Sequence, residues 1–128
     1  MEYKEVYSDV ISSTGEFEKV VRIVECSFQQ NTYKNIDIRT LFVNESLKTF
    51  TKFGISLNIH EFNQLLENLK NGVFGEFGDR RQITIKKHYS MFKVFLTKYN
   101  GTDKYIILTK DDITTLLTKQ NLLEILIK

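Results

Sequence analysis

Basic and aromatic residues alternate along two segments in the last third of the chain, 80–89 (RRQITIKKHY) and 92–100 (FKVFLTKYN). The candidate ligand-binding side chains in these segments are Lys86, Lys87, Tyr89, Lys93, Phe95 and Tyr99. Because successive residues of a strand point to opposite faces, Lys93, Phe95 and Tyr99 would share one face. Lysines can pair with phosphates, and aromatic rings can stack on nucleobases. The pattern therefore favours binding to single-stranded nucleic acid.

Catalytic patterns are missing from the sequence. His60 and His88 have no partner at a metal-ligand spacing, and no glycine-rich loop leads into a helix that begins with Lys-Ser or Lys-Thr. Cys26 is the single cysteine, so it forms neither an internal disulfide nor a cysteine metal cluster, and its setting indicates a strand or core residue. We expect no enzymatic activity, no metal and no cofactor.

Composition indicates a globular chain of 128 residues, with 41% hydrophobic and 27% charged residues. Residues 1–75 carry 8 Lys or Arg and 10 Asp or Glu, whereas residues 76–128 carry 10 and 6. This asymmetry favours an acidic partner on the second half, although an ordinary solvated surface explains it as well. No apolar run is long enough to cross a bilayer, and no signal peptide is recognisable. We expect an intracellular protein, nuclear if the source is eukaryotic.

The first half of the chain has the pattern of strands followed by one helix. Runs rich in Val, Ile, Thr and aromatic residues predict strands over 2–11, 18–28, 35–43 and 49–57. Asn58 is a suitable N-cap, and Glu61 three residues later completes a capping box. A helical apolar stripe follows, and Gly72 suits the C-cap: the stripe is Phe62, Leu65, Leu66 and Leu69.

The second half repeats this ending at a constant offset of 51 residues. Thr109 and Asp112 stand where Asn58 and Glu61 stand in the first half, and the matching apolar stripe is Ile113, Leu116 and Leu117. Strands are predicted over 81–89, 92–100 and 103–108, with a hairpin turn at Asn100-Gly101. The last helix is predicted to continue through 121–128, and 71–79 is predicted to be a connector with one short strand.

These patterns predict an α+β fold of two β-β-β-β-α-type repeats, over 1–72 and 73–128, packed as one compact domain. The repeats would be related by a pseudo-two-fold axis, and each helix would cover the inner face of one curved antiparallel sheet. The outer sheet faces would remain free for an extended polymer.

Two segments resemble the positive cofactor four family of transcriptional coactivators, which bind single-stranded DNA. They are IDIRTLF (36–42) and FTKFGISLNIHEFNQLLENL (50–69). The family pattern is IDIREYW, a basic loop, KGISL and a helix with an aromatic residue at its start. The resemblance covers about residues 20–70. The whole arrangement is similar to the Whirly and Pur-alpha group. The family's basic loop corresponds to residues 49–53, with only thin charge here.

The resemblance implies nucleic-acid contacts in the first half. Arg39 matches the arginine of the family's DIR motif, and Phe42 and Phe28 match its exposed aromatic residues. Lys34, Lys48 and Lys52 flank the hairpins and could contact phosphates. Each residue also has a structural alternative: Arg39 could pair with Asp37 or Glu45, and a strand phenylalanine could be part of the core.

Together these observations predict a protein that binds single-stranded DNA with low sequence preference, in transcription or replication. RNA is an open variant, since stacking and phosphate contacts do not separate the two. A protein-interaction or dimerisation module without nucleic-acid binding also stays open, with the apolar segment 122–128 as its main interface. The sequence leaves monomer and homodimer undecided.

Overall fold

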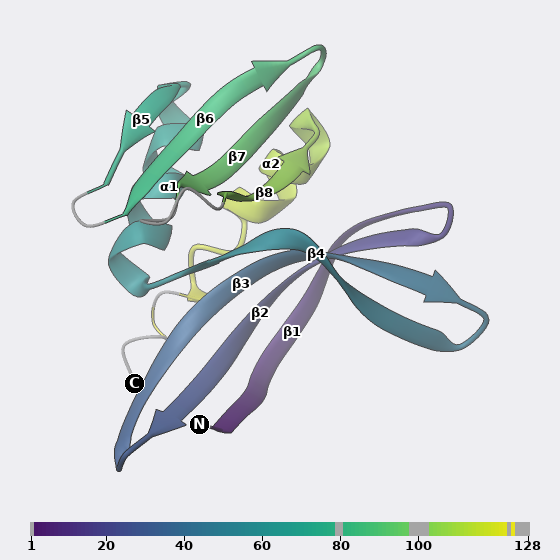
Figure 1. The fold of residues 1–128 in the computed structure, drawn as a ribbon. Coiled ribbons are helices and arrows are strands. Elements are labelled where there is room, and N and C mark those ends of the chain that lie inside the picture. Colours follow the sequence, from purple (N-terminus) through teal and green to yellow (C-terminus); the bar gives the residue numbers. More distant parts are fainter. Residues whose placement is uncertain (1, 79–80, 98–102, 123, 125–128) are drawn as a thin grey trace.

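The computed structural model describes residues 2–78, 81–97, 103–122 and 124, with backbone alone at 97 and 103. It confirms the α+β class, with two four-stranded antiparallel sheets and two helices (Figure 1). Sheet A contains, in order, β1 (Glu2–Thr14), β2 (Phe17–Phe28), β3 (Asn31–Asn44) and β4 (Leu47–Leu57). Sheet B contains β5 (Gly75–Phe77), β6 (Gln82–His88), β7 (Met91–Thr97) and β8 (Asp103–Leu108). The predicted strands are therefore present, and β5 is the short strand expected in the connector.

Helix α1 (Ile59–Asn71) follows β4, and α2 (Lys110–Leu117) follows β8. Both predicted capping boxes are confirmed. Asn58 accepts a hydrogen bond from the amide of Glu61 at 2.8 Å, and Thr109 accepts one from the amide of Asp112 at 3.1 Å. Gly72 ends α1 with a φ of 67°, a left-handed conformation that glycine adopts without strain.

The last helix is shorter than predicted. Helix α2 ends at Leu117 and is capped by Thr118, so it does not continue without a break through 121–128. The side chain of Thr114 donates to the carbonyl of Lys110, and that of Thr118 donates to the carbonyl of Thr115. Such bonds and the branched side chains of threonine compete with a continuing helix. Residues 123 and 125–128, like the predicted turn at Asn100-Gly101, lie outside the described residues.

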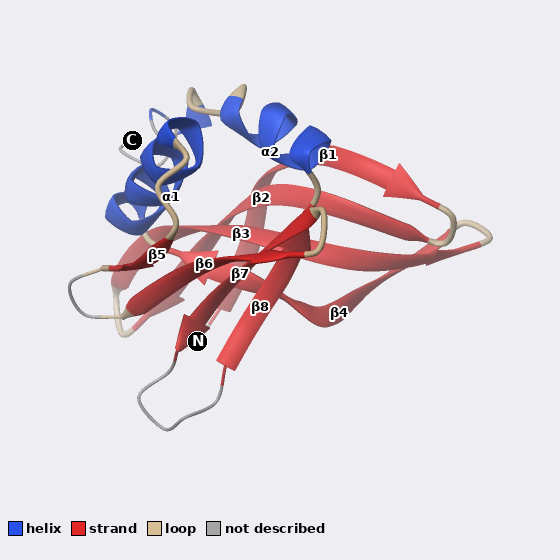
Figure 2. Ribbon diagram, turned by 90° about the horizontal axis from the view of Figure 1, so that it is seen from above, coloured by secondary structure: helices blue, strands red, loops and turns tan. Residues whose placement is uncertain are grey.

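Both helices lie on the same side of the two sheets (Figure 2). One hydrophobic core contains buried side chains from both sheets and both helices. The stripe of α1 is buried as predicted, with Phe62 and Leu65 fully enclosed. In α2, Leu116 is fully buried, whereas Ile113 and Leu117 are only partly buried. Leu122, the first residue of the apolar tail, is also enclosed in this core.

The helices do not divide between the sheets as predicted. Helix α1 contacts β3 and β4 of sheet A, but α2 contacts both β1 of sheet A and β8 of sheet B. The edge strands β4 and β8 also lie side by side. Helix α2 therefore bridges the two sheets, and both outer faces are left on the side away from the helices.

Each capping carboxylate also pairs with a cation from the other half of the chain. Arg81, just before β6, donates to Glu61 at the start of α1. Lys19 on β2 donates to Asp112 at the start of α2, with 2.7 Å between Nζ and Oδ2. Glu61 and Asp112 are buried at 6% and 2% exposure. These two ion pairs anchor the helix starts to the opposite halves.

Candidate nucleic-acid interface

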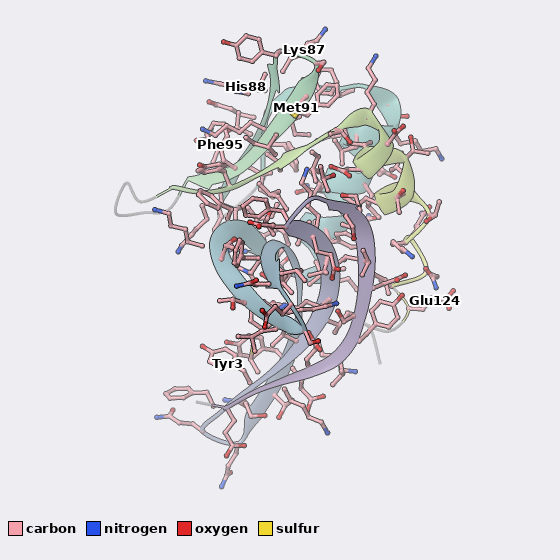
Figure 3. The ribbon with its side chains drawn as sticks, turned by 90° about the vertical axis from the view of Figure 1, so that its right-hand side faces the viewer. Tyr3, Lys87, His88, Met91, Phe95 and Glu124 are labelled. Carbon is pink, nitrogen blue, oxygen red and sulfur yellow. The ribbon has the colours of Figure 1, made fainter. Side chains whose placement is uncertain are left out.

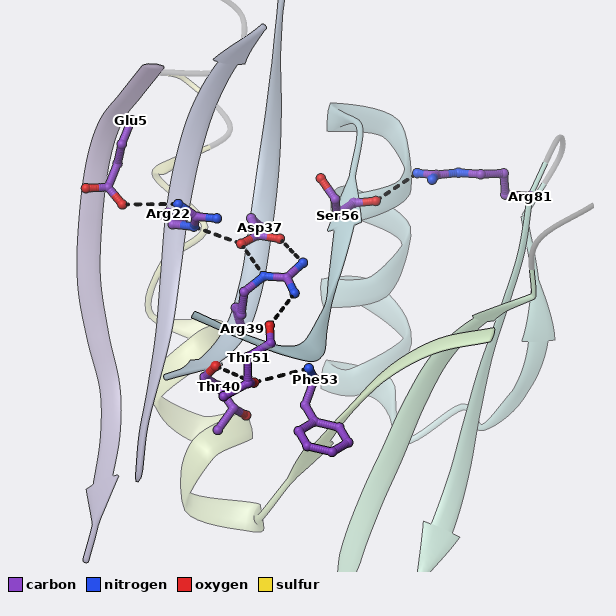
Figure 4. Close-up of polar contacts among 9 residues, drawn as sticks. All are labelled: Glu5, Arg22, Asp37, Arg39, Thr40, Thr51, Phe53, Ser56 and Arg81. Carbon is purple, nitrogen blue, oxygen red and sulfur yellow. Dashed lines mark hydrogen bonds and ion pairs between the residues drawn. The ribbon is translucent and has the colours of Figure 1, made fainter. Parts of the chain in front are cut away.

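Two arginines and one aspartate form a hydrogen-bonded group on the outer face of sheet A (Figure 4). Arg22 donates from Nε to Oδ2 of Asp37 at 2.8 Å. Arg39 donates from Nε to the same oxygen and from Nη2 to Oδ1, both at 3.0 Å. The Asp37 side chain is 4% exposed, whereas those of Arg22 and Arg39 are each 18% exposed. The buried carboxylate therefore fixes two guanidinium planes that still reach the surface.

Strand register explains why these three residues meet. Arg22 on β2 lies directly opposite Asp37 on β3, and Arg39 lies two residues further along β3 on the same face. The partner of Arg39 on β4 is Gly54. A Cβ atom at this glycine would lie 2.8 Å from Cζ of Arg39, so the missing side chain leaves room for the guanidinium group.

A β-bulge in β4 provides another hydrogen-bond acceptor for Arg39. At this point β4 contains more residues than the facing part of β3. The carbonyl oxygen of Thr51 in this segment accepts a hydrogen bond from Nη1 of Arg39 at 2.8 Å. Thr51 Oγ1 donates to the carbonyl of Thr40 at 2.7 Å and accepts from the amide of Phe53 at 3.1 Å. This network orders the extra residues and fixes the backbone position of Phe53 within β4 (Figure 4).

A third arginine reaches this face from the second half of the chain. Arg81 donates from Nε to Glu61 and from Nη2 to the carbonyl of Ser56, both at 2.9 Å. The hydrogen bond to Glu61 raises the pKa of Arg81 above its ordinary value, although burial opposes the shift. The three arginines line a pocket of about 550 Å³, which we name the arginine pocket. Its other lining residues are Tyr3, Val24, Cys26, Tyr33, Asn35, Asp37 and Ser56.

Two aromatic side chains line the arginine pocket, and a third contacts one of its arginines. Tyr3 on β1 and Tyr33 on β3 both face Cys26 on β2, and they are 68% and 47% exposed. Phe50 does not line the pocket, but its ring centroid lies 4.1 Å from Cζ of Arg22. Burial raises the pKa of the Cys26 thiol, although a hydrogen bond with Tyr33 opposes the shift. Because the net shift is upward, the thiolate that nucleophilic chemistry needs is scarce.

A second cluster covers the outer face of sheet B and the neighbouring edge of sheet A. We name it the lysine–aromatic platform, and its members are Lys52, Phe53, Lys86, Lys93, Phe95 and Tyr105. Nζ of Lys93 lies 4.4 Å from the ring centroid of Tyr105 and 5.6 Å from that of Phe95. Among the described residues, no carboxylate pairs with Lys86 or Lys93. Their charge is therefore available to an anionic ligand.

The predicted alternation along β7 is confirmed where the side chains are described. Val94 and Leu96 are buried in the core, whereas Lys93 and Phe95 lie on the other face and are half-buried. Phe95 pairs directly with Tyr105 on β8, which brings a second ring to the same face. The platform is thus a product of strand register as well as of alternation.

The arginine pocket and the platform lie on the same side of the molecule. Phe53 on β4 contacts Tyr105 on β8, with 5.5 Å between their ring centroids, so the aromatic surface continues from sheet A to sheet B. Figure 3 shows Tyr3 and Phe95 on one side and Glu124 on the side of the helices. A single extended ligand could therefore contact both clusters.

The structure brings some of the predicted residues together. Arg39 lies in the arginine pocket, and Lys52, Lys86, Lys93 and Phe95 lie in the platform. Arg39 is also paired with Asp37, which is the structural alternative stated above. Phe28 lies at the end of β2, on the outer face of sheet A, and is 46% exposed.

Other predicted residues lie apart from both clusters. Phe42, Lys34 and Lys87 are on the strand faces opposite to Arg39 and Lys93, and Phe42 packs edge-on against Phe17. Lys48 pairs with Glu18 at 2.9 Å, and Tyr89 is 86% exposed in the turn after β6. Tyr99 lies outside the described residues.

Six basic or aromatic members of the two clusters were not among the predicted site residues: Tyr3, Arg22, Tyr33, Phe53, Arg81 and Tyr105. Arg22 had a usable signal, because VRI on β2 and IDI on β3 carry opposite charges at the centre of equal apolar patterns. Arg81 belongs to the basic segment 80–89, but its place beside sheet A had no signal, since its contacts with Glu61 and Ser56 join segments that are distant in the chain.

Comparison of the chain with family models, curated proteins and solved structures gives no significant match. Among the described residues, no group of three or more His, Cys, Asp or Glu side chains could hold a metal ion. Within the same residues, neither helix has the length and apolar character needed to span a bilayer. The candidate interface therefore rests on its own geometry and chemistry.

Proposed function

We propose that the outer faces of the two sheets bind single-stranded nucleic acid, DNA in the first place, with low sequence preference. The observation that carries this proposal is the continuity of basic and aromatic side chains from the arginine pocket to the lysine–aromatic platform, through the contact between Phe53 and Tyr105. The role is one of binding, without a catalytic step. A place in transcription or replication, in the nucleus if the source is eukaryotic, follows from the family resemblance.

The chemistry of the platform supports a single strand over a duplex. Half-buried rings such as Phe95 and Tyr105 offer faces to bases, and unpaired bases can stack on them. In a duplex the bases are stacked on one another and present only their edges in the grooves. Lysines beside the rings, such as Lys93, can neutralise the phosphates between stacked bases.

We also propose that the two halves are copies of one unit, related by an approximate two-fold axis. The support is that both halves have four strands followed by a helix and that both helices begin with a capping box, at Asn58 and Thr109. This arrangement suits the resemblance to the positive cofactor four family. In that family two subunits pair, and here the second half would take the place of one partner.

The test is a fluorescence anisotropy titration with a labelled thymidine oligonucleotide and with a duplex, repeated over a range of salt. For single strands, the slope of log affinity against log salt is about −0.7 per neutralised phosphate. If Lys52, Lys86 and Lys93 each neutralise one phosphate, the slope should be about −2. RNA of the same sequence, titrated in parallel, separates the two nucleic acids.

Two substitutions separate charge from stacking. Lys93→Ala should weaken binding to all sequences and reduce the slope by about 0.7. Phe95→Ala should lose about 1–3 kcal/mol of stacking while leaving the slope unchanged. The matched controls are Lys70→Ala, at the exposed end of α1, and Phe74→Ala, a 47% exposed ring that contacts Phe92 of the core. Neither control should change affinity.

A folded wild-type protein that shows no preference for single strands over duplex at low salt would refute the proposal. The protein-interaction module would then take its place. Equal losses of affinity for Lys93→Ala and Lys70→Ala would also count against it, because binding would then depend on net charge and not on the platform.

A further inference from the structure

The arginine pocket differs from the platform in how its cations are held. Carboxylates and backbone carbonyls fix the guanidinium groups of Arg22, Arg39 and Arg81, whereas the platform lysines lie over ring faces. A guanidinium group carries five N–H donors in a rigid plane. Within the described part of the chain, Nη1 and Nη2 of Arg22 donate no hydrogen bond to the protein, and Nη1 meets the Glu5 carboxylate only at 3.5 Å. The pocket therefore presents oriented donors that the fold itself does not use.

The pocket also has little net charge. Its three guanidinium groups are held by three carboxylates: those of Asp37, of Glu61, and of Glu5, which lies 3.5 Å from Nη1 of Arg22. A phosphate placed there would meet an almost balanced set of charges and the carboxylate of Asp37. A neutral group with two adjacent acceptor atoms would use the adjacent Nη1 and Nη2 donors of Arg22 without that repulsion.

The shape and the walls of the pocket suit a nucleobase. A volume of about 550 Å³ is within the range of small-ligand sites. The exposed rings of Tyr3 and Tyr33 lie on either side of Cys26 and can stack against a flat base, and the amide of Asn35 lines the same pocket. A base can enter only when it is unstacked, as it is in a single strand.

We propose that the arginine pocket is a subsite for one unstacked nucleobase with two adjacent acceptors, and that guanine fits it best. Atoms O6 and N7 of guanine form such a pair, and arginine is its commonest partner in proteins. Adenine and cytosine each place an amino donor on the corresponding edge. This inference rests on the proposed function: the platform supplies sequence-tolerant affinity, and the pocket adds a preference at one position.

The test compares a thymidine oligonucleotide with the same strand carrying one central guanine. The strand with guanine should bind about tenfold more tightly, with an unchanged salt slope, because one good arginine–guanine pair discriminates by about this factor or more. Hypoxanthine, which keeps O6 and N7, should retain the gain. Replacement by 7-deazaguanine, which lacks the N7 acceptor, or by adenine should remove it.

Variants assign the preference to the pocket. Arg22→Ala should abolish the preference for guanine, so that the strand with guanine and the thymidine strand bind this variant with equal affinity. Because Arg22 holds Asp37, a circular dichroism melt must accompany this variant. Tyr33→Leu, at an exposed position, provides a second variant that leaves this ion pair intact and should reduce the preference. Tyr89→Leu, at an exposed position outside the pocket, is the matched control.

The outcomes separate this inference from the proposed function. Binding of both strands with equal affinity would overturn the base subsite and leave the proposed function standing. A flatter salt slope in Arg22→Ala, with no loss of base preference, would mean that the pocket holds a phosphate and would also overturn it. If no single strand binds at all, the proposed function itself fails.

Discussion

Replacing Asp112 by Asn tests whether the ion pairs between the two halves stabilise the fold. Asp112 is 2% exposed and accepts hydrogen bonds from Lys19 Nζ at 2.7 Å and from the amide of Thr109 at 2.9 Å. The asparagine keeps the size and one acceptor for the cap but loses the charge. Removing one partner of a buried pair costs about 3–5 kcal/mol. Because the side chain of Lys19 is 21% exposed and keeps some hydration, we expect a loss at or below the bottom of this range, about 2–3 kcal/mol.

Urea denaturation followed by circular dichroism measures this loss. With a slope of about 1–3 kcal/mol per molar urea, the midpoint should fall by roughly 0.7–3 M. The matched control is Asp111→Asn, which removes the same charge from the same helix turn at an exposed position. It should lose only the interaction with the helix dipole, about 0.3–1 kcal/mol.

The same pair predicts the response to acid. Burial alone would raise the pKa of Asp112, but the hydrogen bonds from Lys19, Thr109 and Ser12, with the charge of Lys19, lower it below the ordinary value. A lowered pKa contributes stability that is present above the ordinary pKa, about 3.9, and is lost as the pH falls through the lowered folded-state value. The difference in stability between wild type and Asp112→Asn should therefore shrink in that acid range. A difference that is no larger than that of Asp111→Asn at neutral pH would refute the reasoning.

Three further predictions concern the core and the ion pairs. Leu66→Ala should lower the free energy of unfolding by about 2–5 kcal/mol in a denaturant titration, because the side chain is 4% exposed in the shared core. Gly54→Ala places a methyl group 2.8 Å from Cζ of Arg39 and should cost about 1–3 kcal/mol in the same assay. Lys119→Ala removes the hydrogen bond that lowers the pKa of Asp9, so an NMR titration should show this pKa returning toward its ordinary value.

Local signals were sufficient to predict the helix starts and most strands. Asn58 and Glu61 form their capping box within four consecutive residues, and the apolar stripe of α1 follows from the helical period alone. The end of α2 differs from the prediction. The apolar run 122–128 suggests a longer helix, but the threonines before it favour an end. Their side chains bond to nearby carbonyls, as that of Thr118 does, and so favour a helix end.

The candidate binding surface could be predicted only in part, because it depends on register between strands. Alternation along β7 placed Lys93 and Phe95 on one face without any knowledge of partners. The same rule, applied to adjacent residues, would have separated Lys86 from Lys87, which point to opposite faces. The place of Tyr105 needed the pairing of β7 with β8.

The arginines of the pocket show why a charge pattern alone gives an incomplete account of such a site. Arg39 carries the same formal charge as any surface lysine. Hydrogen bonds to Asp37 and to the carbonyl of Thr51 fix the plane of its guanidinium group, and the absence of a side chain at Gly54 leaves room for it. Rigid, nearly neutral groups of this kind contribute little to salt-dependent affinity and much to geometric selection. The lysines of the platform have the opposite character. If both proposals hold, the platform would bind single strands of any sequence and the pocket would add a preference for one base at one position.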